Sequence, residues 1–580
     1  MALTSPDTRA RALPYVAALD GMRAIAVTAV LLYHGGVPGV PGGFLGVDVF
    51  FVLSGFLITS LLLTGRRADG TIDLRGFWVR RARRLLPAAV VVIVACLVVV
   101  AAFYPAEAAQ TRGDAIASLL YLNNWHQVLA GRSYFAGFGR PPLLQHLWSL
   151  SVEEQFYLLW PLALGLGLTR IGKRWTVRAT ALAALLSALA MALLFVPGHD
   201  ASRVYYGTDT HASGLLIGAL LAFAWPLGPL RTAPHRGAVA VLDAAAVVAL
   251  AALIGALATW HDYDPLVFRG GLVAASVVTA VLLAAVVHPA SRVAPLLGVA
   301  PARWIGQRSY GIYLWHWPVM TLTRPGLDLA WSRWVLVPLQ IGAAVGLAAA
   351  SYRWVEQPVR AGRAPERLKA WLDARRPHQR LGIAVAATLA VGLAGAWIAV
   401  RDSPAVDVAH LPGLNSAAAR RAPERSPVSQ PPRRPLALGA SVMLGAQEAL
   451  GRHMRVDAAV GRQADDIVGR IDAYRAAGRL PSRVVVQIGE NGPIPASDLR
   501  ELRNALRGVR RVVLVNVRVP RSWGAQTNAQ LARAVRGWPQ ARIADWYDAS
   551  AAPGLLYEDG THPNPRGARV YAAIVRRALR

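Results

Sequence analysis

The sequence has a single cysteine, Cys96, among 580 residues. One thiol excludes an intrachain disulfide and any CxxC metal site, so neither a disulfide framework nor a zinc module organises this chain. Because Cys96 lies inside the apolar run that follows Pro87, we interpret it as a packing residue. We therefore expect no metal centre.

Acidic residues are also scarce, with 33 Asp and Glu against 62 Lys and Arg and a formal net charge of +29. Such an excess can mark nucleic-acid binding. Many of these basic residues, however, occupy short loops between apolar runs: Arg80, Arg81, Arg83, Arg84, Arg170, Lys173, Arg174, Arg178, Arg363, Arg367, Lys369, Arg375 and Arg376. That distribution is typical of the cytoplasmic loops of a membrane protein, so we expect no nucleic-acid partner.

We also expect no removable signal peptide, since no long apolar stretch with a small-residue cleavage site precedes Asp20. Hydrophobic residues make up 54% of the chain, and they recur in runs of the length that a helix needs to cross a bilayer. Such runs begin near Gly21, Phe44, Leu85, Val152, Ala179, His211, Ala238, Gly270, Tyr310, Trp334 and Leu381. They predict a polytopic α-helical membrane domain with about 11 transmembrane helices, in which residues 115–120 form a helix that does not span.

The charge distribution predicts the orientation of this domain. With the N-terminus inside, the basic loops 66–84, 170–178 and 360–380 are cytoplasmic and the chain after Val400 lies outside. We predict four segments: a membrane domain at 1–362, a cytoplasmic loop with an additional transmembrane helix at 363–400, a flexible linker at 401–434 and an outer domain at 435–580.

In the outer domain, β-rich runs alternate with helical stretches. The runs are 436–438, 484–488 and 512–517, and the helical stretches are 498–507, 528–535 and 567–579. This alternation predicts a small soluble α/β domain with a largely parallel sheet. Arg500, Arg503, Arg507 and Arg510 follow helical spacing, which fits either a solvated basic face or docking on an anionic glycan.

Ionisable residues inside the predicted spans suggest a function, because they are costly in lipid. Arg23 and His34 are eleven positions apart, close to three helical turns or about 16 Å, so both face one side of the first span. Arg81 and Arg84 together suit a phosphate group. The alternatives are a snorkelling Arg with a helix-end His for the first pair, and topology-setting charge for the second.

Three further segments, 145–157, 309–318 and 351–358, place aromatic, His or carboxylate groups at membrane edges, where aromatic anchoring is the alternative explanation. Together with the pairs above, the chain resembles the acyltransferase-3 family of membrane acyltransferases over about residues 15–360. The resemblance is carried by residues 19–26 (LDGMRAIA), His34, 43–58 (GFLGVDVFFVLSGFLI), Arg81, Arg84, 148–153 (WSLSVE) and 309–316 (SYGIYLWH).

The resemblance implies transfer of an acyl group, usually acetyl from acetyl-CoA, with no permanently bound cofactor. It implies that His34 is the catalytic imidazole, that Arg23 is its partner, and that Arg81 and Arg84 lie near the CoA donor. An imidazole can deprotonate a hydroxyl or carry an acyl group, which agrees with this role. Glu153 is a candidate to orient an imidazole or to bind sugar hydroxyls.

The outer domain contains a second set of candidate catalytic residues. Ser441 follows a predicted strand in 439–443 (GASVM), and Asp559 precedes His562 by three residues in 559–562 (DGTH). Serine, histidine and aspartate are the components of an acyl-transfer triad. Gly461 and Asn491 are candidate oxyanion donors.

This set resembles the SGNH hydrolase family over about residues 435–580, and fusion of such a domain to an acyltransferase-3 module is a familiar arrangement. The family usually reads Gly-Asp-Ser where this chain has Gly439, Ala440 and Ser441, and Glu490 replaces the small residue that commonly precedes Asn491. The domain is therefore either an active acyl-transfer domain or a binding or degenerate one.

The sequence thus predicts an O-acyltransferase, most readily an O-acetyltransferase. Its expected location is the bacterial inner membrane, with the SGNH-like domain extracytoplasmic. Its expected partners are the lipid bilayer, acyl-CoA and an envelope glycan such as peptidoglycan, O-antigen or an exopolysaccharide. The alternatives are a transporter with a glycan-binding outer domain, because buried Arg and His also mark transport pathways, and a membrane-anchored carbohydrate esterase.

Overall fold

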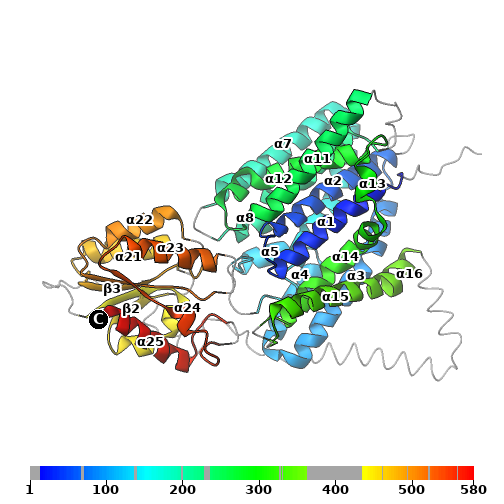
Figure 1. The fold of residues 1–580 in the computed structure, drawn as a ribbon. Helices are drawn as coiled ribbons and strands as arrows, with labels where there is room; N and C mark the ends of the chain where they lie inside the picture. Colours follow the sequence, from blue (N-terminus) through cyan, green and yellow to red (C-terminus); the bar gives the residue numbers. More distant parts are fainter. Residues whose placement is uncertain are drawn as a thin grey trace, which may run out of the picture. The chain divides into compact units, whose positions relative to one another are not determined.

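The computed structural model describes residues 13–66, 71–135, 140–196, 200–227, 236–325, 328–329, 331–361, 434–459, 462–492, 494–519, 523–557 and 560–580. These residues divide into two compact units, a helical unit that holds most of residues 13–361 and an α/β unit that contains residues 434–580 (Figure 1). The predicted span that begins near Leu381 and nearly all of the predicted linker lie outside the described residues.

The helical unit begins with α1 (Ala17–His34), η1 (Gly43–Leu45), α2 (Gly46–Thr64), α3 (Leu74–Phe103), η2 (Pro105–Glu107), α4 (Ala108–Leu119), α5 (Asn123–Leu129), α6 (Leu147–Arg170) and α7 (Gly172–Leu194). It continues with α8 (Ser202–Tyr206), α9 (Thr208–His211), α10 (Ser213–Ala224), α11 (Arg236–Thr259), η3 (Val267–Gly271), α12 (Leu272–Val287), α13 (Ala294–Leu297), α14 (Ala300–Leu322), α15 (Arg333–Ser351), η4 (Tyr352–Glu356) and α16 (Gln357–Arg360).

Seven helical segments among the described residues are long and apolar enough to cross a membrane. They are Ala17–His34, Gly43–Thr64, Leu74–Phe103, Gly172–Leu194, Gly237–Thr259, Val267–Val287 and Arg333–Arg360. They coincide with the runs predicted from Gly21, Phe44, Leu85, Ala179, Ala238, Gly270 and Trp334. A polytopic helical membrane domain is therefore confirmed.

The predicted number of about 11 transmembrane helices is not confirmed. The runs predicted from Val152 and Tyr310 form α6 and α14, of 24 and 23 residues, but polar clusters at residues 153–155 and 307–309 make them less apolar. The run predicted from His211 forms α10, which follows the short helices α8 and α9 and whose 12 residues extend only about 18 Å. The predicted non-spanning helix at 115–120 is part of α4, which also has 12 residues.

Close packing of α1 against α14 shapes the centre of the helical unit. Gly306 of α14 lies so near α1 that a Cβ added there would be 1.9 Å from the carbonyl oxygen of Asp20. Small residues allow helix backbones to approach in this way where no hydrophobic force drives helices together in lipid. The C-terminal halves of α1 and α14 consequently lie close enough for their polar side chains to meet.

The α/β unit contains a parallel five-stranded sheet with strand order β2-β1-β3-β4-β5. The strands are β1 (Leu436–Gly439), β2 (Arg455–Ala458), β3 (Arg483–Gln487), β4 (Arg511–Val515) and β5 (Ala541–Ala544). The helices are α19 (Ser441–Gly445), α20 (Gln447–Gly451), α21 (Ala464–Ala476), α22 (Ala496–Ala505), α23 (Gly524–Arg536), α24 (Trp546–Ala549) and α25 (Pro565–Leu579). The predicted parallel α/β domain is confirmed.

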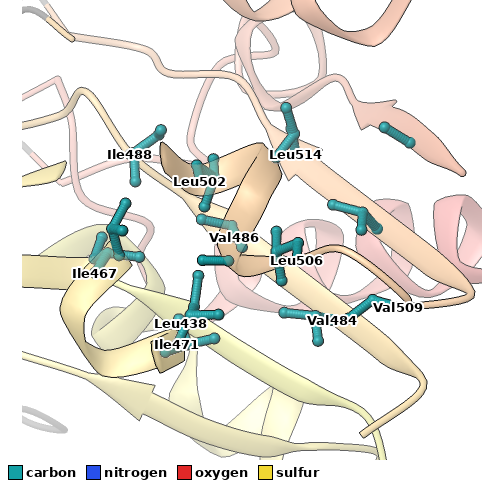
Figure 2. Close-up of a cluster of buried hydrophobic side chains, with 14 of the residues drawn as sticks. Leu438, Ile467, Ile471, Val484, Val486, Ile488, Leu502, Leu506, Val509 and Leu514 are labelled. Atoms are coloured by element: carbon teal, nitrogen blue, oxygen red, sulfur yellow. The ribbon is translucent and has the colours of Figure 1, made fainter. Parts of the chain in front are cut away.

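Both faces of the sheet are buried, and strand alternation divides the apolar residues between them. Leu438, Val484 and Leu514 pack with α21, α22 and α23 on one face, the cluster that Figure 2 shows. Ala437 and Val485 pack with α24 and α25 on the other face (Figure 1). This explains why the strands read as continuous apolar runs and not as an alternating pattern.

The strand order places a topological switch point between β1 and β3. The chain leaves β1 towards β2 on one side and leaves β3 towards β4 on the other, so the loops after β1 and β3 diverge there. Crevices of this kind, at the carboxyl ends of the strands, are where open α/β sheets bind their ligands. The loop after β1 carries Ser441, and the loop after β3 carries Glu490 and Asn491.

Candidate functional site

A cavity of about 90 Å³ in the helical unit brings together four of the predicted site residues. Its wall includes Arg23 from α1, Arg81 and Arg84 from α3, and Glu153 from α6. These side chains are up to 130 positions apart in the sequence, so their convergence is a property of the fold. His34, the fifth predicted residue of this domain, is not part of the cavity wall.

The four arginines of α3 between residues 80 and 84 differ in exposure. Arg81 and Arg84, three positions apart, line the cavity and are partly buried. Arg80 and Arg83 are exposed, and Arg80 Nη1 lies 3.8 Å from Asp73 Oδ2. Exposed charge can set topology alone, whereas Arg81 and Arg84 can also bind a ligand in the cavity.

Glu153 is held inside the cavity by neutral hydroxyl groups. Ser54 donates to Glu153 Oε1 at 2.8 Å, and the Tyr157 hydroxyl donates to Ser54 Oγ at 2.9 Å. The Arg81 guanidinium stacks on the Tyr157 ring, 5.1 Å from its centroid. The cavity therefore combines a fixed carboxylate with three guanidinium groups, a donor set suited to an anionic or strongly polarised ligand.

Three histidines gather at the C-terminal end of α1. His34 Nδ1 lies 3.1 Å from His316 Nε2, and the rings of His316 and His146 are 5.8 Å apart. Trp317 packs its edge against His34 at 4.8 Å. The sequence motif of residues 309–316 contained His316, but nothing in its spacing showed that it would face His34.

Hydrogen bonds that the rings donate to backbone carbonyl groups fix the tautomers of this cluster. His316 Nδ1 lies 2.6 Å from the carbonyl oxygen of Tyr313, so Nδ1 carries the proton and Nε2 is an acceptor. His34 must then donate through Nδ1 to His316 Nε2. In a neutral His34 this leaves the lone pair on Nε2, the atom that can act as base or nucleophile.

Tyr313 connects the histidine cluster with the cavity. Its side chain lines the cavity, and its hydroxyl group donates to the carbonyl oxygen of His146 at 2.8 Å. The same hydroxyl lies 2.6 Å from Ser149 Oγ, another residue of the cavity wall. One residue of α14 thus positions His316 through its carbonyl group and borders the cavity through its ring.

In the α/β unit, Ser441 and His562 form the pair that the sequence predicted. His562 Nε2 lies 2.8 Å from Ser441 Oγ, although the two residues are 121 positions apart. Both side chains are almost completely buried. This is the geometry of a serine activated by a neighbouring imidazole base.

Two other predicted residues of this site, Asp559 and Gly461, lie outside the described residues. Asn491 is described: its Nδ2 donates to the carbonyl oxygen of Arg462 at 2.9 Å. An amide nitrogen carries two hydrogens, so this bond leaves one that can serve an oxyanion.

Glu490 is the residue of this site to which sequence reasoning assigned no function. It is 2% exposed, and its Oε2 accepts a hydrogen bond from the backbone N–H of Val442 at 3.2 Å. Burial raises the pKa of Glu490 to about 7, while the backbone groups of Val442 and Ala440 and the charge of His562 act in the opposite direction. Gly489, with φ +90°, forms the turn that brings Glu490 there.

Asp457 lies after Val456 on the edge strand β2 and has a structural role. Burial alone would raise its pKa, but hydrogen bonds and charges from Arg470 and Arg462 outweigh burial and hold the pKa below its usual value. Arg462 Nη2 is 3.0 Å from Asp457 Oδ1, and Arg462 Nη1 donates to the Asp457 carbonyl group at 2.7 Å. This ion pair fixes the described end of the loop that follows β2.

A second cavity, of about 440 Å³, opens beside His562 in the α/β unit. Its wall includes Tyr557, Arg452 and Arg569 as well as His562. The imidazole therefore lies between the buried serine and a basic cavity large enough for part of a sugar.

These two sites define a membrane acyltransferase: a helical domain with an imidazole beside an arginine-lined cavity, and an α/β domain with a serine activated by histidine. The chain belongs to the acyltransferase-3 family, whose acyltransferase domain matches residues 16–353.

Proteins of known name are similar over nearly the whole chain. "Peptidoglycan O-acetyltransferase OatA" of Listeria monocytogenes is 34% identical and covers 97% of each chain. "Putative peptidoglycan O-acetyltransferase YrhL" of Bacillus subtilis is 34% identical over 98% of each chain, and "O-acetyltransferase OatA" of Staphylococcus aureus is 32% identical over 97% of this chain and 95% of its own.

A solved structure, the C-terminal catalytic domain of the peptidoglycan O-acetyltransferase A of Streptococcus pneumoniae with a methylsulfonyl adduct, is 22% identical. It covers 25% of this chain and 92% of its own, with a TM-score of 0.24.

Proposed function

We propose that this enzyme moves an acetyl group from cytoplasmic acetyl-CoA to a hydroxyl group of peptidoglycan outside the cell membrane. His34 takes the acetyl group first, and Ser441 delivers it. The observation that carries the proposal is that one chain holds two acyl-accepting groups, each beside an imidazole: His34 with His316 at 3.1 Å, and Ser441 with His562 at 2.8 Å. The names of the similar proteins support the acetyl group and the acceptor.

The lining of the membrane cavity supports binding of the acyl donor. Arg81 and Arg84 are partly buried in its wall, where their guanidinium groups can bind the phosphate groups of CoA. A donor held by these arginines lies in the same cavity as Tyr313, whose carbonyl group positions His316 beside His34.

The chemistry balances over three steps. His34 Nε2 attacks the thioester carbon, the C–S bond breaks, and the CoA thiolate takes up the proton that His34 Nδ1 loses. Ser441 Oγ then attacks the acyl-imidazole as His562 removes the hydroxyl proton, and this proton passes on to the imidazole of His34 as it leaves, so both histidines are neutral again. An acceptor hydroxyl finally attacks the acetyl-serine, and His562 takes its proton and gives it to Ser441 Oγ as the serine leaves.

Membranes that contain the enzyme provide the test. Acetyl-CoA labelled in the acetyl group is expected to transfer label first to the protein and then to added muropeptides, but not to an O-antigen polysaccharide. A transporter would leave no covalent acetyl product, and an esterase would remove label from acetylated muropeptides. Absence of label from both protein and glycan overturns the proposal.

Replacing His316 is expected to slow the first step. His316→Phe removes the acceptor that fixes the tautomer of His34 and should lower formation of acetyl-protein by about 10²-fold. His316→Gln keeps an acceptor at a similar distance from the backbone and should recover part of this loss. Single-turnover labelling measures both, with His288→Ala as the control histidine of the same domain. Equal rates for His316→Phe and the wild type would contradict the tautomer argument.

Arg83 and Arg84 of α3 differ in exposure and give a matched pair of arginine variants. Arg84→Ala is expected to raise the KM for acetyl-CoA by about 10-fold with little change in kcat, because it removes binding made equally to donor and transition state. Arg83→Ala, one position away and exposed, should leave KM within twofold. Initial rates at varied acetyl-CoA concentration measure the difference. An equal effect of both variants would mean that only the overall charge of α3 matters.

A further inference from the structure

The nucleophile Ser441 follows Ala440, whose side chain has no polar group. A serine that must hold its hydroxyl at 2.8 Å from His562 needs a rigid backbone on both sides. Ala440 has φ −105° and ψ −147°, and Ser441 is the first residue of the short helix α19. The N–H groups at the start of a helix have no partner within the helix, so this turn depends on an acceptor from elsewhere.

Glu490 supplies that acceptor from the neighbouring strand. β1 and β3 pair directly, and Glu490 lies in the loop that follows β3. Its Oε2 accepts from Val442 N–H at 3.2 Å, and the backbone of Ala440 also favours its charged form. The carboxylate thus holds the residue that directly follows Ser441.

Several observations make Glu490 more than a space-filling side chain. A carboxylate that is 2% exposed is costly to bury unless its hydrogen bonds compensate. Within the described residues its second oxygen, Oε1, has no hydrogen-bond partner. Gly489, whose left-handed φ forms the turn, has no room for a side chain because an added Cβ would lie 2.5 Å from Thr527 Cγ2. The loop therefore keeps the Glu490 carboxylate buried although its burial costs free energy.

We propose that Glu490 is a positioning residue for Ser441, whose carboxylate holds the backbone N–H of Val442 beside the nucleophile in place of a side chain at Ala440. The proposal rests on the function proposed above, in which Ser441 carries the acetyl group. The carboxylate that the SGNH family usually carries at the position of Ala440 is then supplied in this chain by Glu490, in the loop after β3. The outer domain then keeps a positioned nucleophile and is not degenerate.

The different position of the carboxylate gives the experiment, performed on the full-length enzyme in membranes with p-nitrophenyl acetate as the acyl donor to Ser441. Glu490→Ala is expected to lower kcat by about 10²-fold, the size of effect that a small misplacement of a reacting group produces, with KM within twofold. Adding Ala440→Asp to this variant returns a carboxylate to the turn from the other side and should recover at least about 10-fold of the loss. Glu501→Ala is the control variant, because Glu501 is an exposed glutamate on α22.

The outcomes distinguish the two proposals. If Glu490→Ala keeps the wild-type rate, or if Ala440→Asp restores nothing to a variant that is still inserted and resistant to proteolysis, Glu490 has no positioning role. If Glu490→Ala does not accumulate, the variant Glu490→Gln, which keeps an oxygen acceptor for Val442 N–H, must fold and retain most of the rate. If the proposed function is wrong, a different experiment shows it: Ser441→Ala will acetylate the glycan at the wild-type rate.

Discussion

Ser441→Ala is expected to abolish acetyl transfer to the glycan while leaving acetylation of the membrane domain intact. The hydroxyl oxygen is the side-chain atom of Ser441 that can carry an acetyl group, and His562 Nε2 lies 2.8 Å from it. Loss of the nucleophile of a serine–histidine pair lowers kcat by on the order of 10⁶-fold, which is below detection in a glycan assay. Labelled acetyl groups should then accumulate on His34 because the next acceptor is missing.

The measurement combines two signals from one membrane preparation: O-acetyl groups released from purified peptidoglycan by mild base, and label retained on the protein. Ser550→Ala is the matched control, since Ser550 is also buried in the α/β unit and its hydroxyl bonds only to the backbone of its own segment. Acetylated glycan in Ser441→Ala cells would mean that the membrane domain acetylates the acceptor directly.

The fold could be predicted wherever the apolar pattern was continuous. The buried strands β1, β3 and β4 and the helices α22, α23 and α25 follow from runs whose period or length is plain in the sequence. The edge strand β2 and the helix α21 were not predicted. Arg455 and Asp457 make β2 polar because an edge strand has only one neighbour and a partly exposed surface.

The membrane part was predicted less well where polar residues interrupt a span. The span predicted from His211 is only the short helix α10, because the backbone is extended at Gly207 and the His211 side chain is buried, so the residues before it form the separate helices α8 and α9. His211 Nε2 lies 3.0 Å from Asp48 Oδ1, and Nδ1 bonds the Tyr205 carbonyl group at 2.7 Å. Hydropathy cannot show that an interruption is satisfied by a partner more than 160 positions away.

The functional sites, too, could be predicted only where they did not depend on contacts between residues far apart in the sequence. Residue types identified Arg23, Arg81, Arg84 and Glu153 individually, and the fold gathers them in one cavity. Neither His316 nor Glu490 received a function from the sequence, because each acts on a residue of another element: His316 on the tautomer of His34, and Glu490 on the turn around Ser441. Such contacts depend on the packing of α1 with α14 and on the pairing of β1 with β3.

His34→Ala is expected to separate the two halves of the reaction. Without the imidazole, acetyl-CoA has no first acceptor, so neither the protein nor the glycan should acquire label, a loss of at least about 10³-fold. Hydrolysis of p-nitrophenyl acetate should persist at the wild-type rate, because that ester reaches Ser441 from water and needs only His562. Ser441→Ala gives the reverse for protein label and for ester hydrolysis, whereas the glycan stays unlabelled in both variants.

His288→Ala controls for the loss of a histidine from the same membrane domain, and equal amounts of inserted protein are verified by immunoblot. If His34→Ala still labels Ser441 from acetyl-CoA, the acetyl group passes from donor to serine without an acyl-imidazole, and His34 acts only as a base. If His34→Ala also loses hydrolysis of the aqueous ester, the α/β domain depends on the state of the membrane domain, and the two sites are coupled. The relay requires that ester hydrolysis survive and that transfer from acetyl-CoA fail, because only that combination places His34 before Ser441 on the path of the acetyl group.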